Sequence, residues 1–202
     1  MDKTRAREII AELQRALPLV EDWIDKYLEA HAAQAIPVNE LGFSRISHYF
    51  SRERLETSKA VNVDRVQVPP LSKMGIPHFI DFEEAQFRGI TYKDTFFVGR
   101  EAHDCEATHF HEIVHIIQWD ELKPRVFLMV YAVGLLTQGY QDCPLERMAY
   151  QFQSAFESGN AIDDLEQKIR SGTRRVAKAF PNNDMHTAGD SASKKRGTYF
   201  SI

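Results

Sequence analysis

Two histidines four positions apart, His111 and His115, are the residues best suited to chemistry, and Glu112 follows the first of them directly. On a helix, residues four apart project from one face about a turn apart, so two imidazoles can bind a single metal ion. Glu112 would then stand beside the metal, where it can take a proton from a bound water molecule. A purely structural metal site needs no such base, so the motif predicts catalysis. The alternative is a chance match on an ordinary amphipathic helix whose histidines only form hydrogen bonds.

A catalytic zinc ion needs a third protein ligand and an open position for water. Glu146 is the best candidate, because Pro144 is typical of the first turn of a helix, where a carboxylate also interacts favourably with the helix dipole. An exposed first-turn glutamate is the alternative. We therefore expect Zn²⁺ as the cofactor, with His111, His115 and Glu146 as its ligands.

The rest of the chain predicts the elements that would position these side chains. Apolar residues recur at helical spacing over residues 4–33, where Pro18 could kink or split the helix. Alternation of apolar and polar residues predicts a strand at Ala60–Val68, and two β-rich runs within Gly89–Glu101 predict a hairpin or one bent strand. Later helices are expected from Cys105 to about Leu122, over about 125–138, from Pro144 to about Ser158, and over about 161–180.

A helix, then strands, then a run of helices is an α+β pattern, and residues 1–180 are expected to form a single domain. Residues 181–202 are polar and rich in serine, lysine and asparagine, so we expect a weakly structured tail there.

The composition excludes several classes of protein. The 202 residues are 43% apolar and 27% charged, which is ordinary for a soluble globular protein, and the net charge of −4 offers no attraction to nucleic acid. The longest apolar stretch, Val126 to Leu136, is shorter than the roughly 20 residues that cross a membrane, and no secretory signal is evident. Cys105 and Cys143 are too few for a disulfide scaffold and are expected to be buried, inert thiols. We expect a cytoplasmic protein with no membrane partner.

The segments Thr108–Trp119 and Pro144–Tyr150 resemble the small zincin-like metallopeptidases of the gluzincin type, in which a glutamate from a later helix completes a His-Glu-x-x-His site. Thr95–Gly99 is similar to the edge strand that such folds place beside the metal cleft. The resemblance covers about residues 90–158. It implies a small antiparallel or mixed sheet packed against an active-site helix and a C-terminal helical run. It also implies hydrolysis of a peptide or protein substrate by a zinc-activated water, with Glu112 as general base.

The chain departs from the larger gluzincins at one position. Those enzymes often place an aspartate four residues after the glutamate ligand, where this chain has Tyr150. The hydroxyl of Tyr150 could hydrogen-bond a metal ligand, face the oxyanion of the substrate, or belong to the core. Tyr140, in the loop before Pro144, is a second candidate for stabilising the oxyanion.

The motif also fits two other kinds of protein. One is a non-catalytic zinc-binding domain of zincin-like fold that acts as a regulatory or interaction module. The other is a di-iron protein, since Glu106-x-x-His109 and Glu112-x-x-His115 both match the unit of such sites. Di-iron sites draw their units from different helices, however, and these two would share one helix. The sequence indicates neither the cleavage specificity nor the oligomeric state.

Other residues near the motif are weaker candidates. His109 points away from His111 on a helix and is expected to be exposed. Asp120 could support a ligand histidine or be solvated, and His103 and Arg147 could reach the cleft. The last four residues, 199–202, could fold back as a plug or simply fray.

Overall fold

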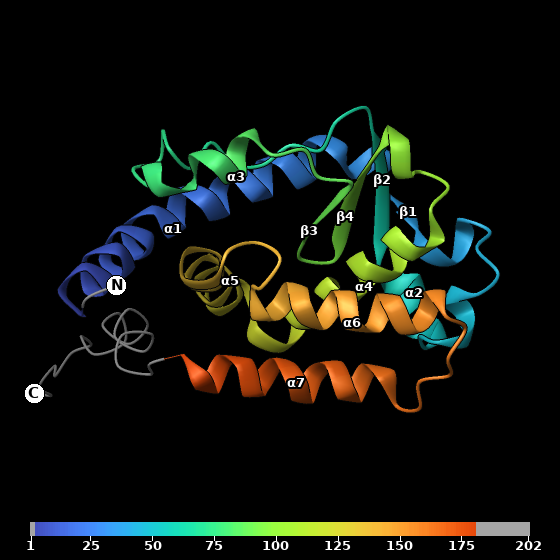
Figure 1. The fold of residues 1–202 in the computed structure, drawn as a ribbon. Coiled ribbons are helices and arrows are strands. Elements are labelled where there is room, and N and C mark those ends of the chain that lie inside the picture. Colours follow the sequence, from blue (N-terminus) through green and yellow to red (C-terminus); the bar gives the residue numbers. More distant parts are fainter. Residues whose placement is uncertain (1–2, 181–202) are drawn as a thin grey trace, which may run out of the picture.

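The computed structural model describes residues 3–180 of the chain, and over these residues seven α-helices accompany a four-stranded mixed sheet (Figure 1). The predicted α+β class is confirmed. The strand order is β1 (Ile36–Pro37), β2 (Lys59–Val63), β4 (Thr95–Gly99) and β3 (Gly89–Tyr92). Strands β2 and β4 run parallel, and the other two pairs are antiparallel. The predicted tail, 181–202, lies outside the described residues.

Strands β3 and β4 form the predicted hairpin, with a turn at Lys93, whose φ is 57°. All five residues of β4 are buried, and in the sheet β4 lies between β2 and β3. The expectation that Thr95–Gly99 is an edge strand is therefore wrong. The edge strands are β1 and β3, and β3 lies beside helix α4 (Glu106–Leu122).

Strand β2 is shorter than the sequence pattern predicted, since it ends at Val63 rather than at Val68. Its register explains the difference. Val63 pairs with Gly99, the last residue of β4, after which the chain enters a 3₁₀ turn. Residues 64–68 keep the alternating pattern but have no neighbouring strand to pair with.

The sheet separates two apolar cores. Phe97 of β4 packs in the core that also contains the buried face of α1 (Lys3–His31), whereas Phe96 and Val98 pack in the core that contains the apolar face of α4. Successive side chains of a strand point to opposite faces, so one strand serves both cores. The predicted N-terminal helix is α1, which runs without interruption through Pro18 on its exposed side, so Pro18 does not split it.

The helical run after the sheet follows the prediction closely. Its members are α4, α5 (Pro124–Gln138), α6 (Pro144–Glu157) and α7 (Leu165–Ala179). Helices α6 and α7 pack on α4, on the side of the sheet opposite α1 (Figure 1). The sequence pattern missed two short helices, α2 (Arg52–Thr57) and α3 (Ile80–Glu84). Among the helices within residues 3–180, none combines the length and the apolar character needed to cross a membrane.

Candidate metal centre

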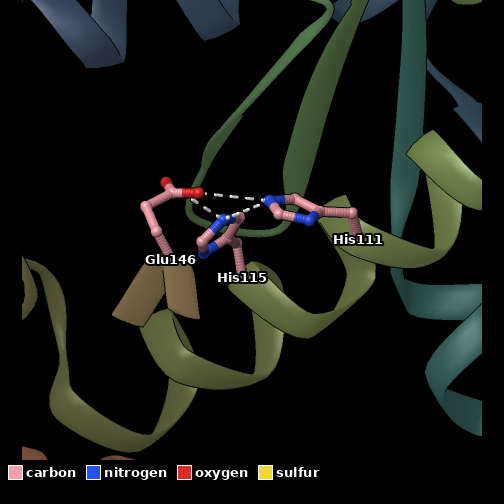
Figure 2. A group of neighbouring side chains, drawn as sticks. All are labelled: His111, His115 and Glu146. Atoms are coloured by element: carbon pink, nitrogen blue, oxygen red, sulfur yellow. Dashed lines mark hydrogen bonds and ion pairs between the residues drawn. The ribbon is translucent and has the colours of Figure 1, made fainter. Parts of the chain in front are cut away.

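The imidazoles of His111 and His115, from α4, and the carboxylate of Glu146, from the first turn of α6, point toward one another (Figure 2). One ligand atom of each lies within 4.8 Å of the others. The two Nε2 atoms are 3.0 Å apart, and the Glu146 oxygens lie 3.3 Å from His111 Nε2 and 3.4 Å from His115 Nε2. All three residues are buried, so the sequence-predicted trio forms one cluster inside the protein.

This cluster fits the requirements of a zinc ion. Ligands that share a tetrahedral zinc at about 2.0–2.1 Å lie about 3.3 Å from one another, close to the observed separations. Two imidazole nitrogens and one carboxylate oxygen are also donors that zinc accepts in catalytic sites. Glu146 Oε2 is buried and has no hydrogen-bond partner, a costly state for a carboxylate oxygen unless a cation binds it.

Two glutamines hold the histidine rings in place. Gln153 Oε1 accepts a 3.0 Å hydrogen bond from Nδ1 of His111, and Gln118 Oε1 accepts a 2.8 Å hydrogen bond from Nδ1 of His115. An amide oxygen can only accept, so each Nδ1 carries the proton. Each Nε2 is then free to present its lone pair to a metal. Groups that hydrogen-bond the other ring nitrogen of a metal-binding histidine usually fix its tautomer in this way.

The third ligand is oriented by a tyrosine from α5. The hydroxyl of Tyr131 donates a 2.6 Å hydrogen bond to Oε1 of Glu146. Burial, and then the charge of Glu146, raise the pKa of Tyr131 well above its ordinary value, so this hydroxyl keeps its proton and remains a donor.

The cluster is electrostatically coupled. Burial by itself would raise the pKa of Glu146, but the neighbouring His115 and His111 outweigh burial and hold that pKa well below its ordinary value. Burial by itself would lower the pKa of His115, but Glu146 raises it to about 9. Without a cation, an ion pair between His115 and Glu146 therefore occupies the centre at neutral pH.

The carboxylate of Glu112 lies beside the cluster and is 4% exposed. The hydroxyl of Thr91, on β3, lies 2.7 Å from Oε2 of Glu112. Gly89, on the same strand, comes so close that a Cβ at this position would lie 2.8 Å from Cδ of Glu112. Burial raises the pKa of Glu112 and outweighs the electrostatic interactions with His111 and His115, which lower it. A carboxylate with a raised pKa is suited to general-base work.

The centre opens onto a cleft of about 650 Å³ that Tyr140 and Tyr150 also line. The ring of Tyr150 packs against His111, with centroids 4.6 Å apart, and its hydroxyl interacts with that of Tyr140. Burial raises the pKa of both tyrosines, so both hydroxyls are protonated donors at neutral pH. The structure thus brings both predicted tyrosines to the candidate site. Tyr150 is 42% exposed, which excludes the alternative that it is a core residue.

Several weaker candidates lie elsewhere. His109 was expected to be exposed but is 1% exposed, because the loop before α2 places Phe43 over its ring. The ring of His103 lies against the carbonyl oxygens of Val63 and Val98, away from the cleft. Asp120 pairs with Arg54 at 2.7 Å and supports no histidine.

The di-iron interpretation finds no support in the geometry. Oε1 of Glu106 accepts hydrogen bonds from the backbone N–H groups of Arg45 and Ile46, and His109 contacts the carbonyl oxygen of Cys105. The Glu106–His109 unit is thus engaged in structural bonds. Of the two cysteines, Cys143 is buried as expected and Cys105 is only partly buried. Neither belongs to the cluster found among the described residues.

Sequence reasoning missed four residues of the site: Thr91, Gln118, Tyr131 and Gln153. Helical spacing offered a signal for two of them. Gln118 follows His115 by three positions on α4, and Gln153 follows Glu146 by seven on α6, so each shares the face of a ligand. Thr91 and Tyr131 reach the site from β3 and α5, and only the tertiary structure reveals them.

Comparisons of the chain with models of known protein families, with curated proteins and with solved structures found no match.

Proposed function

We propose that the protein is a zinc-dependent peptidase with His111, His115 and Glu146 as metal ligands and Glu112 as general base. The observation that carries the proposal is the buried carboxylate of Glu112 beside the ligand cluster, where it faces the cleft. A site that binds metal only for stability has no need of a buried, uncoordinated carboxylate at that place, since such a group costs free energy.

The reaction divides between the metal and the chain. A zinc ion bound at the cluster supplies Lewis acidity, which lowers the pKa of water to about 7 and polarises a carbonyl group. Glu112 accepts the proton of the attacking water and delivers it to the leaving amine nitrogen. Thr91 holds that carboxylate by a 2.7 Å hydrogen bond, and the close approach of Gly89 confines it to one side.

The developing negative charge on the substrate oxygen needs hydrogen-bond donors. Tyr140 and Tyr150 are protonated, line the same cleft as Glu112, and interact with each other. We assign them to the oxyanion. Tyr150 is the better placed of the two, because its ring lies directly on His111.

The same set of two histidines and one carboxylate also binds ferrous iron in oxygenases. Glu112 favours the zinc hydrolase, since hydrolysis needs a general base next to the attacking water. Metal analysis of the purified protein separates the two possibilities, with stoichiometric zinc expected and stoichiometric iron contradicting the proposal.

The ligand set is tested with His111→Ala and Glu146→Ala, each of which should abolish stoichiometric zinc. Glu106→Gln is a matched control, because Glu106 lies on α4 but bonds only to a backbone loop. Zinc retained in Glu146→Ala would overturn the third ligand.

Catalysis is tested with Glu112→Gln, which preserves size and should keep zinc while abolishing cleavage of a peptide mixture followed by mass spectrometry. Native-rate cleavage by this variant would overturn the assigned base. Zinc in the wild type without any cleavage, together with unfolding on chelation, would favour the non-catalytic domain.

A further inference from the structure

A second cavity adjoins the metal centre, next to the open cleft, with which it shares His111 and Glu112. Its volume is about 100 Å³, and His111, Glu112, His115 and Glu146 all contribute to its lining, so it is continuous with the candidate site. Most of the remaining wall comes from α1, α5, β3 and residues 69–82, and Phe87, Trp119 and Tyr140 complete it. These elements surround a space that begins at the proposed zinc ion and extends into the core.

The walls of this cavity are apolar away from the metal centre. Helix α1 contributes Leu13, Leu17, Val20 and Ile24, and α5 contributes Leu128 and Ala132. Among the lining residues there is no lysine, arginine or aspartate. An apolar cavity that opens on a catalytic centre favours an apolar group of the substrate, because burial of a charged group without a partner is costly.

We infer that this cavity receives the aliphatic side chain of the substrate residue next to the scissile bond, of the size of leucine or isoleucine. This inference rests on the proposed function, since the scissile bond must lie at the metal centre. It names a specificity determinant, which the predicted ligands and base do not.

The size of the cavity favours an aliphatic chain over an aromatic ring. An apolar cavity of about 150 Å³ in another protein is large enough to bind benzene. At about 100 Å³, this cavity is smaller and fits a branched four-carbon chain better than a phenyl ring. The walls are also built from buried packing residues such as Trp119 and Phe127, which resist expansion.

The open cleft is more polar than the apolar cavity, so we expect only the cavity to select the substrate by its side chain. Its lining includes Asp81, Gln86, Arg88 and Gln153 beside apolar residues. Such a surface suits the main chain and polar side chains of a peptide. We therefore expect strict selection only for the side chain that enters the apolar cavity.

The test uses small hydroxamates, which bind zinc directly, so that binding is measured without turnover. Acetohydroxamate, 4-methylpentanohydroxamate and 3-phenylpropanohydroxamate carry a methyl, a branched aliphatic and a phenyl group. Their affinities for the zinc-loaded full chain are measured by calorimetry. The branched aliphatic compound should bind at least about tenfold more tightly than the other two, since single methylene groups alter recognition by about tenfold or more.

Cavity-filling variants locate the effect. Ala132→Leu adds three carbons to the cavity wall and should abolish the preference while zinc content is unchanged. Ala155→Leu is the matched control, because Ala155 is a partly buried alanine on α6 that lines neither cavity, and it should keep the preference.

Each outcome has one meaning. Equal affinities, tighter binding of the phenyl compound, or a preference that survives in Ala132→Leu would overturn the inference while leaving the proposed peptidase intact. The expected preference without any peptide cleavage would contradict the peptidase and support the cavity. Absence of zinc from the wild type would overturn both.

Discussion

The hydroxyl of Tyr131 donates a 2.6 Å hydrogen bond to Oε1 of Glu146, and Oε2 of the same carboxylate is left buried without a hydrogen-bond partner. Helix α5 thus gives the two oxygens of Glu146 different surroundings. One is held by a neutral donor, and the other is 3.3 Å from His111 Nε2, where a cation would bind it. Helix α5 therefore takes part in the candidate site although it carries none of the predicted ligands.

Removing this hydroxyl should weaken metal binding without unfolding the protein. In Tyr131→Phe the ring remains stacked on Phe127, but Glu146 loses the donor that orients it. Loss of such a partner costs about 10–100-fold in metal affinity, measured by competition with a chelator. Tyr49→Phe is the control, because that hydroxyl bonds a distant carbonyl oxygen and its loss should leave zinc affinity unchanged. Equal affinities in wild type and Tyr131→Phe would refute the role of Tyr131.

Gln118 connects the two helices that supply the ligands. Its Oε1 accepts from His115 Nδ1, and its Nε2 donates a 3.1 Å hydrogen bond to the carbonyl oxygen of Leu145, next to Glu146. Gln118→Leu should therefore reduce zinc affinity about 10–100-fold. It should also lower the free energy of unfolding of the metal-free protein by about 1–3 kcal/mol, since the buried Nδ1–H of His115 loses its acceptor. Chelator competition and urea unfolding measure the two effects, and Gln151→Leu, at an exposed position of α6, should show neither.

How far the sequence predicted the structure depends on whether the signal was local. His111, Glu112 and His115 lie within one helical turn and a half, so their spacing alone predicted a common site. Glu146 is harder, but its place after Pro144 indicated a first helical turn. The hairpin and the long helices could be predicted equally well, because a turn marks the hairpin and the spacing of apolar residues marks each helix.

The wrong or absent predictions have a common physical cause. In each case, residues distant in the sequence decide whether a residue pairs, is buried or reaches the site. Residues 64–68 alternate like a strand, yet β4 ends too early to pair with them. His109 lies on a face that is buried only because Phe43 and Phe96 pack on it. Thr91 contributes to the site because its strand, and not β4, forms the sheet edge beside α4.

The metal-free protein should have a distinctive pH dependence of stability. The pKa of His115 is raised from 6.5 to about 9. Its contribution to the free energy of unfolding is therefore fully present below pH 6.5 and is lost as pH rises toward 9. The pKa of Glu146 is lowered from 4.5. Its contribution to the free energy of unfolding is therefore present above pH 4.5 and is lost as pH falls below that value. The ion pair therefore stabilises the metal-free fold most between pH 4.5 and 6.5.

Thermal unfolding of chelator-treated wild type and Glu146→Gln isolates this contribution. The difference in Tm between the two proteins should be greatest in the window between pH 4.5 and 6.5 and should shrink steadily up to about pH 9. A difference that stays constant from pH 6.5 to 9 would show that no charged pair forms in the metal-free protein.

Gly89 confines the carboxylate of the proposed base, Glu112. In Gly89→Ala, the new Cβ would lie 2.8 Å from Cδ of Glu112, so the carboxylate must move while the backbone, which has no positive φ there, stays in place. Misplacement of a catalytic group by about 1 Å costs on the order of 100-fold in rate. We expect kcat to fall to about that extent, with zinc content and Tm close to those of the wild type. Gly99→Ala is the matched control, because its Cβ would also meet a glutamate side chain, that of the exposed Glu101, at 3.1 Å. If both variants lose activity equally, strain in the hairpin and not displacement of Glu112 is responsible.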